Sequence, residues 1–367
     1  MVRSFVAREV VPEYPQWEVA GAPPRDAFRR LGDLGIMGMN MPEEWGGSGQ
    51  DYTYNVVLQE ETARAGVVIG SLRTHLDVIL PYFRRYADRR QQERWFAGLS
   101  AGDLMTAIAL TEPDTGSDLA AVRTTAVRTG DRYVVNGAKT YITGGALADL
   151  IVVLCRTSTD AANRRNGLTL LVVEDGMPGF VKGRKLPKIG LKAQDTVELS
   201  FNDVSVPAEN RLGEDGQAFG YLGANLPQER LAIAVGSIAQ SRAALDLTIQ
   251  YAANRRIFGR PVGAFQNTKF ELAAMATEIE AGQALLDRGV AEHVAGELTP
   301  ADAAKVKLFC TELQGRVVDR CLQLFGGFGY ITESPIARLY ADARVTRIYG
   351  GTSEVMKSII SKSLGLS

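Results

Sequence analysis

The spacing of apolar residues changes twice along this 367-residue chain, from helical to strand-like and back to helical. Residues 27–34 and 54–64 carry apolar side chains at helical spacing, with Pro and Gly residues between the two segments. From about Thr106 the segments become short, rich in β-branched residues and bounded by turn-forming residues; they are residues 132–137, 150–155, 168–173 and 196–201. They predict an antiparallel β block, either a barrel or a sandwich.

Helical spacing returns after Gly213 in three long segments rich in Ala and Leu, at residues 231–253, 265–291 and 301–324. Between the last two, Gly296 fits a helix stop, Thr299 an N-cap and Pro300 a first helical turn. Three consecutive long helices with short connections predict an antiparallel bundle. We therefore expect an N-terminal α-helical domain at 1–104, a middle β domain at 105–213 and a C-terminal α-helical domain at 214–367.

Composition and charge exclude several classes of protein. A formal net charge of −1 gives no electrostatic basis for binding nucleic acid or an anionic membrane surface. Charged or turn residues interrupt every apolar run before it reaches membrane-spanning length, and residues 1–13 lack the apolar core of a signal peptide. The three cysteines are far apart and only two histidines are present, so neither a disulfide framework nor a metal site is expected. We expect a soluble, cytoplasmic protein.

Two neighbouring motifs open the β block. Residues 111–118 are Thr-Glu-Pro-Asp-Thr-Gly-Ser-Asp, and residues 136–143 are Asn-Gly-Ala-Lys-Thr-Tyr-Ile-Thr. Taken alone, the first motif favours a plain turn, because Pro, Asp and Gly set the backbone while Ser or Asp bonds to its own main chain. Such a turn also presents N–H groups and hydroxyls that can bind a flavin ring or a phosphate.

Five further motifs complete a series that is known from one protein family. They are Pro-Glu-Glu-Trp-Gly-Gly at 42–47, Phe-Asn-Asp-Val-Ser-Val-Pro at 201–207, Arg-Arg-Ile-Phe-Gly at 255–259 with Gln266, Gln-Leu-Phe-Gly-Gly-Phe-Gly-Tyr at 323–330, and Ile-Tyr-Gly-Gly-Thr-Ser-Glu at 348–354. In this order and at these separations, the chain closely resembles the acyl-CoA dehydrogenase family over essentially its whole length. The resemblance implies an α+β multidomain fold with an N-terminal α-helical domain, a middle antiparallel β-barrel domain and a C-terminal four-helix-bundle-like α domain.

The resemblance also implies that FAD lies between the β domain and the helical bundle, with part of each site supplied by a neighbouring subunit. Residues 108–117 match the segment that lines the flavin and the start of the CoA thioester, and residues 141–143 match the strand on the opposite flavin face. The implied cofactor-binding residues are Ile108, Leu110, Thr111, Gly116, Ser117, Tyr141, Ile142, Thr143, Arg255, Phe258, Gln266, Gln323, Gly326, Gly327, Thr352 and Glu354.

Several of these residues also have purely structural interpretations. Tyr141, where many members carry Trp or Phe, also fits a half-buried aromatic residue of a strand. Arg255 fits either a pyrophosphate ligand or a solvated arginine at a helix end. Gly326 and Gly327 fit either the close approach of a phosphate or ribose, or a helix stop. Glu354 is also favoured in a first helical turn by the helix dipole.

One position departs from the family pattern. Many members carry the catalytic glutamate directly after the tyrosine that corresponds to Tyr349, and this chain has Gly350 there, which removes no proton. Residues 225–234, Asn-Leu-Pro-Gln-Glu-Arg-Leu-Ala-Ile-Ala, closely resemble the stretch that carries the base in the long-chain and isovaleryl branches. Those branches also have Gly at the C-terminal position, and the combination is most like the long-chain branch. We therefore predict Glu229 as the base; its structural alternative is a carboxylate at a helix start near Pro227, satisfied by local N–H groups.

The reaction requires a carboxylate because the α-proton of a thioester is only weakly acidic. The carbonyl must be polarised, and a base must sit beside the α-carbon with a pKa that desolvation raises. In the family, a flavin ribityl hydroxyl and the backbone N–H after the tyrosine hold the carbonyl, and Gly350 retains this N–H. The β-hydrogen then leaves as a hydride to flavin N5. The implied substrate-binding residues are Ser117, Arg230, Tyr349 and Gly351, although Arg230 also fits an exposed charge and Tyr349 a core residue.

The predicted function is FAD-dependent α,β-dehydrogenation of a fatty acyl-CoA thioester to trans-2-enoyl-CoA, with the electrons passed to electron-transfer flavoprotein. The resemblance implies a homo-oligomer, a dimer or a tetramer built from dimers. One alternative is an acyl-CoA oxidase-like enzyme that uses oxygen, for which the chain is short. The other is a non-catalytic flavin- and CoA-binding homologue, which Gly350 alone suggests. Acyl chain length and branching do not follow from the sequence.

Overall fold

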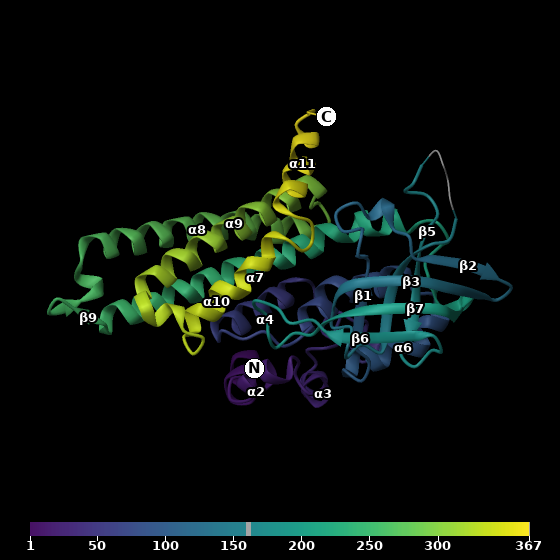
Figure 1. Cartoon of the computed structure of the whole chain (residues 1–367), viewed down its shortest axis with the longest axis horizontal. Helices are drawn as coiled ribbons and strands as arrows, with labels where there is room; N and C mark the ends of the chain where they lie inside the picture. The colour runs from purple at the N-terminus through teal and green to yellow at the C-terminus, as the bar shows by residue number, and fades with distance from the viewer. Residues whose placement is uncertain (159–162, 367) are drawn as a thin grey trace.

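The computed structural model describes residues 1–158 and 163–366. Along the chain it forms a set of short helices, then a β-sheet, then a bundle of long helices (Figure 1). This order confirms the predicted fold class and follows the two changes in apolar spacing.

Short helices make up the N-terminal part. They are α1 Val2–Phe5, α2 Tyr14–Ala20, α3 Arg25–Asp33, α4 Thr53–Arg64, α5 Leu80–Tyr86 and α6 Arg89–Ala101, with the π-helical segments η1 Val6–Val10 and η3 Thr74–Ile79 and the 3-10 turn η2 Glu43–Trp45. The helices predicted at 27–34 and 54–64 correspond to α3 and α4. A capping box starts α6: the Asp88 side chain accepts from the Gln91 N–H, and the Gln91 side chain accepts from the Asp88 N–H.

One eight-stranded sheet forms the middle of the chain. Its strands are β1 Thr106–Ala109, β2 Thr125–Thr129, β3 Arg132–Thr143, β4 Leu150–Arg156, β5 Leu168–Glu174, β6 Phe180–Lys185, β7 Thr196–Pro207 and β8 Arg211–Leu212. The order is β6-β7-β3-β2-β4-β5-β8, with β1 parallel to β4. Among the described residues no pairing joins β6 to β8, so the sheet is open where a barrel was expected. Two-residue β8 offers too few backbone groups to close it.

Strands β4 and β5 are buried on both faces, which explains their continuous apolar sequences. Leu150, Val152 and Leu154 pack into one core cluster with aromatic residues of the N-terminal helices. Their alternating neighbours, Ile151 and Val153, belong to a second cluster on the other face of the sheet. The N-terminal helices therefore cover one face of the sheet.

The C-terminal part is built on three long helices that lie side by side in Figure 1. Its elements are α7 Ala218–Asn254, α8 Gln266–Val294, α9 Pro300–Phe325, α10 Pro335–Ala343 and α11 Ser353–Ser363, with the small hairpin β9 Arg256–Ile257 and β10 Arg260–Pro261. Thr299 caps α9 by accepting from the Asp302 N–H, and Gly296 follows α8 with φ +75°, both as predicted. The helix predicted over 231–253 begins earlier, at Ala218, and continues through Pro227.

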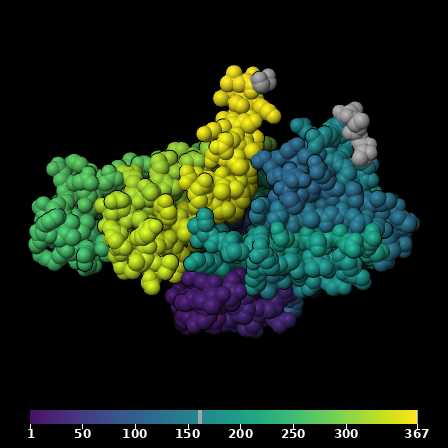
Figure 2. All heavy atoms as spheres, in the orientation of Figure 1, coloured from purple at the N-terminus to yellow at the C-terminus, as the bar shows by residue number. Residues whose placement is uncertain are grey.

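The ends of the bundle lie in different surroundings. Figure 1 shows the β9–β10 hairpin at the tip of the bundle farthest from the sheet, whereas α11 stands at the junction between bundle and sheet. Figure 2 shows the yellow C-terminal helix projecting from the body of the molecule. Leu364 and Leu366, which follow α11, are exposed.

Candidate active site

Glu229 and Gly350 lie next to each other, although they belong to distant parts of the chain. Gly350 has φ +63° in the turn before α11, a conformation that suits glycine. A Cβ built on it would lie 3.5 Å from Glu229 Oε1 and would overlap Ile233 Cδ1. The carboxylate of Glu229 therefore reaches the space next to position 350, where many family members were expected to place their glutamate.

The surroundings of Glu229 suit a base rather than a helix cap. It lies in the interior of α7, and no described residue donates a hydrogen bond to its partly buried carboxylate. Burial raises the pKa of Glu229, and the nearby cations Arg73, Arg230 and Lys307 oppose this rise. The alternative of a helix-start carboxylate satisfied by local N–H groups is wrong, because α7 continues through Pro227.

Two buried cations hold the turn at Gly350 and Gly351. Arg230 Nε donates to the Gly350 carbonyl at 3.4 Å, and Lys307 Nζ donates to the Gly351 carbonyl at 2.5 Å. Burial and the neighbouring Arg230 lower the pKa of Lys307 to about 8. Arg230 is buried, so the exposed-charge interpretation is wrong. Lys307 had no predicted role, although a lysine on the buried face of α9 was a visible signal.

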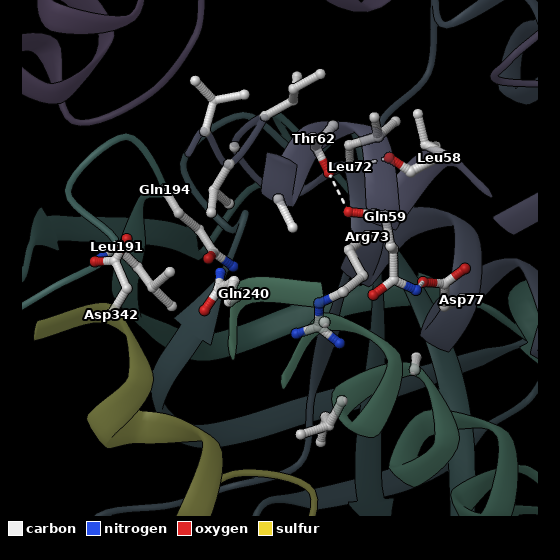
Figure 3. Close-up of a pocket in the computed structure, with 18 of the residues that line it drawn as sticks. Leu58, Gln59, Thr62, Leu72, Arg73, Asp77, Leu191, Gln194, Gln240 and Asp342 are labelled. Carbon is white, nitrogen blue, oxygen red and sulfur yellow. Dashed lines mark hydrogen bonds between the residues drawn. The ribbon is translucent and has the colours of Figure 1, made fainter. Parts of the chain in front are cut away.

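A cavity of about 80 Å³ opens beside these residues. It is lined by α4, the segment that leads into η3, α7 and Tyr349, and Figure 3 shows Arg73 in its interior. The Arg73 Cζ atom lies 5.4 Å from the centre of the Tyr349 ring. Tyr349 thus borders a cavity that Ile233, one helical turn from Glu229, also lines. Arg73 was absent from the predicted site because no motif includes it.

The predicted flavin-facing residues of the β domain lie together. The Thr140 N–H donates to the Thr111 carbonyl at 2.9 Å, and Lys139 Nζ donates to the Leu110 carbonyl at 3.1 Å. Ile108, in β1, is therefore close to the end of β3, which carries Tyr141, Ile142 and Thr143. The Tyr141 side chain is 69% exposed at φ +59°, so the half-buried interpretation is wrong. The Ile142 side chain packs in the core of the sheet.

A buried ion pair holds the turn at 112–117 against strand β3. Lys139 Nζ lies 2.9 Å from Glu112 Oε1, and the same carboxylate accepts from the N–H groups of Arg123 and Thr124. Burial opposes ionisation of Glu112, but Lys139 and these N–H groups lower its pKa. The spacing of the two motifs therefore has a structural cause that the sequence did not reveal.

Beyond this ion pair, the turn exposes Gly116 and Ser117, whose N–H groups donate to no described residue. Unpaired N–H groups in a turn can bind a flavin ring or a phosphate.

The remaining predicted cofactor residues divide between two places. One group lies near the tip of the bundle, where the rings of Tyr251 and Phe325 stack with their centroids 4.1 Å apart. This group consists of Arg255, Phe258, Gln266, Gln323, Gly326 and Gly327. Figure 1 shows this tip at one end of the molecule and the sheet at the other. Within one chain the two groups of cofactor residues do not come together, and Arg255 is exposed at the end of α7.

Thr352 and Glu354 lie at the start of α11, directly after the turn at Gly350 and Gly351. Thr352 caps α11 by accepting from the Val355 N–H, and Glu354 is exposed in the first helical turn. Both positions have the structural role that helix capping and the helix dipole favour. Neither role prevents contact with a cofactor.

In the described ranges, no helix is both long and apolar enough to cross a membrane. Across the same residues, no group of three or more His, Cys, Asp or Glu side chains is arranged to hold a metal ion.

Comparisons with known proteins cover almost the whole chain. Family models for the acyl-CoA dehydrogenase N-terminal, middle and C-terminal domains match residues 1–103, 107–204 and 216–365. The mitochondrial long-chain specific acyl-CoA dehydrogenase of Mus musculus is 41% identical over 363 residues, covering 99% of this chain and 84% of the relative.

Solved structures show the same similarity. The crystal structure of an acyl-CoA dehydrogenase from Geobacillus kaustophilus has a TM-score of 0.97 and 44% identity, covering 99% of this chain and 96% of that one. A glutaryl-CoA dehydrogenase from Mycobacterium smegmatis, in complex with FADH2, has a TM-score of 0.89 and 28% identity, covering 99% and 92% of the two chains.

Proposed function

Because the chain belongs to the acyl-CoA dehydrogenase family, we propose that Glu229 removes the α-proton of a fatty acyl-CoA thioester to give the trans-2-enoyl-CoA. The family is FAD-dependent, and the protein is a flavoprotein oxidoreductase of fatty acid metabolism. The observation that carries the proposal is the distance of 3.5 Å between Glu229 Oε1 and a Cβ placed at Gly350. A carboxylate at this point faces the space that the base of other members would occupy.

The residues around Glu229 support a role in proton transfer. Burial raises its pKa, which brings the carboxylate nearer to the strength needed to remove a weakly acidic proton near neutral pH. The Gly350 N–H donates to no described residue, so it is free to hold the thioester oxygen as negative charge develops there. Arg230 and Lys307 fix the carbonyls of the same turn and so hold this N–H in place.

Bound FAD would supply the acceptor for the β-hydride. Tyr141 and Thr143, with the backbone of Ile142, would lie against one face of its ring system. The turn at Gly116 and Ser117 would offer N–H groups to the flavin and to the thioester end of the substrate. An exposed aromatic ring is suited to exclude water from such a face.

We also propose that the cofactor site is completed by a second copy of the chain. The group that contains Arg255 lies near the β9–β10 hairpin, at the end of the bundle away from the sheet whose strand β3 carries Tyr141 (Figure 1). Phe258 and Tyr330, near the same tip, are 93% and 87% exposed, and apolar surface of this kind favours burial against another subunit. A dimer, or a tetramer built from dimers, would bring the two groups together.

Three further expectations stay proposals. Electrons would pass to an electron-transfer flavoprotein, the protein would be cytoplasmic, and the domains would divide near residues 104 and 213.

The proposed base is tested by anaerobic mixing of the holoenzyme with acyl-CoA thioesters. Glu229→Gln should retain FAD and bind the thioester, yet reduce its flavin at least about 100-fold more slowly, since a general base typically contributes that much or more. Glu280→Gln, which changes an exposed glutamate of α8, is the matched control. Near wild-type bleaching by Glu229→Gln would refute the assignment.

The electron acceptor is tested separately on the reduced enzyme. Reduction of electron-transfer flavoprotein should be much faster than formation of peroxide in air, because Tyr141 and the bound product shield the flavin. Equal rates with the two acceptors would favour the oxidase alternative.

A further inference from the structure

The lining of the cavity beside Glu229 includes a cation, Arg73. A substrate with a plain hydrocarbon chain would need only apolar neighbours there. Arg73 directly precedes η3, a π-helical segment of the kind often found at functional sites. Its guanidinium lies among the lining residues in Figure 3, between Gln59 and Asp77 on one side and Gln240 on the other. Its Nη1 atom is buried and has no hydrogen-bond partner among residues 1–158 and 163–366.

The neighbouring acidic groups leave this guanidinium unpaired. Burial opposes the charge of Arg73, but the neighbouring Tyr349, Asp77, Glu229 and Tyr52 together raise its pKa. No carboxylate of the described chain lies within the 4.0 Å of an ion pair with Arg73. Asp77 is already engaged, because its two oxygens accept from the Asn55 and Gln59 amides.

Glu229 is not a suitable permanent partner either. A carboxylate that must take up a proton in each turnover would lose basicity in a direct ion pair with an arginine. The guanidinium of the half-buried Arg73 side chain therefore lies in the lining of the cavity without a hydrogen-bonded counter-ion. The buried Nη1 donor has no acceptor, so an anion that enters the cavity would satisfy it.

We propose that Arg73 binds a carboxylate carried on the acyl chain of the substrate, so that the enzyme acts on a dicarboxylyl-CoA thioester. A guanidinium holds a carboxylate through two parallel hydrogen bonds, which no hydrocarbon terminus provides. The position of Arg73 limits the chain length: its Cζ lies 5.4 Å from the ring of Tyr349, which directly precedes Gly350. The second carboxylate would therefore lie only a few bonds from the α-carbon, as in a short diacid. This inference rests on the proposed function and narrows its substrate class.

The test compares two thioesters of nearly the same shape with the holoenzyme. Glutaryl-CoA carries a terminal carboxylate, and 5-methylhexanoyl-CoA replaces that carboxylate with an isopropyl group. We expect kcat/KM for flavin reduction to favour glutaryl-CoA by about tenfold or more, the size of one charged hydrogen-bonded contact. Arg73→Met should abolish this preference, and Arg73→Lys should retain part of it.

The outcomes distinguish binding of a substrate carboxylate by Arg73 from a role of Arg73 in the fold or on the base. If Arg73→Met slows both thioesters by the same factor, Arg73 serves the fold or the base, and the inference is overturned. Wild-type enzyme that reacts with 5-methylhexanoyl-CoA and rejects glutaryl-CoA would also overturn it, while leaving the proposed function intact. Failure of every thioester to bleach the flavin would refute the proposed function itself. Should Arg73→Met not fold, the wild-type preference and its change in Arg73→Lys decide the question.

Discussion

Moving the base from α7 to the turn at Gly350 would test the geometry on which the catalytic assignment depends. The starting variant is Glu229→Ala, which removes the carboxylate and clears the space next to position 350. Adding Gly350→Glu places a new carboxylate there. The new Cβ would overlap Ile233 Cδ1, and Ile233→Val deletes that methyl group. The complete variant is therefore Glu229→Ala with Gly350→Glu and Ile233→Val.

The magnitudes follow from the local structure. A non-glycine residue at φ +63° costs about 1–2 kcal/mol, and Ile→Val in a core costs about 0.5–1.5 kcal/mol. Their sum is a modest part of the roughly 5–15 kcal/mol stability of a typical domain, so the variant should fold. Loss of the base alone should slow flavin reduction by about 10²–10⁴-fold. Because a displacement of about 1 Å can cost 100-fold, the moved base should recover part of this loss.

The assay is anaerobic stopped-flow bleaching, with thermal unfolding and FAD content measured on each variant. We expect the triple variant to exceed Glu229→Ala by at least about tenfold, and the double variant that retains Ile233 to gain much less. Ile233→Val alone measures the contribution of the lost methyl group. A folded, FAD-loaded triple variant no faster than Glu229→Ala would show that positions 229 and 350 do not reach the same α-carbon.

Other variants test the electrostatics and the assembly. Burial raises the pKa of Glu229 and the base acts deprotonated, so flavin reduction should speed up as pH rises through that pKa. Arg73→Met removes a cation that lowers this pKa and should move the rise to higher pH, which a pH series of stopped-flow rates would measure. Arg255→Ala should release FAD and weaken subunit association in gel filtration, whereas Lys305→Ala, in an exposed ion pair near the start of α9, should change neither. Burial lowers the pKa of His75 to about 3, so the folded state holds this imidazole neutral. The free energy of unfolding should therefore be highest above about pH 6.5 and fall as the pH drops towards 3, because the unfolded chain takes up the proton first. Urea unfolding of His75→Gln should accordingly depend less on pH across that range than unfolding of the wild type.

Local signals in the sequence determined the type and order of the elements. Apolar spacing located α3, α4, β4 and β5 to within a few residues, because the side-chain period follows from backbone geometry. Thr299 was predicted as an N-cap because capping involves residues three positions apart. Proline was less informative, since tertiary packing carries α7 through Pro227.

The motifs similarly determined the family and its cofactor, but they did not reveal what lies between them. Lys139 and Glu112 belong to different motifs, and their buried ion pair is visible only once β3 packs against the turn. Arg73 and Lys307 belong to no motif, and their positions near Glu229 depend on how η3 and α9 pack against α7.

The sequence by itself therefore determined which kinds of residue this chain offers for catalysis, and the tertiary structure decided which of them meet. Glu229 was chosen by resemblance, and the packing of the final turn against α7 brings its carboxylate to Gly350. The arrangement of bundle and sheet keeps the β9–β10 end of the bundle, next to Arg255, away from the strand that carries Tyr141. Local periodicity sets the direction of a side chain from its own helix or strand. The distance between two such elements depends on long-range packing, which that periodicity does not contain.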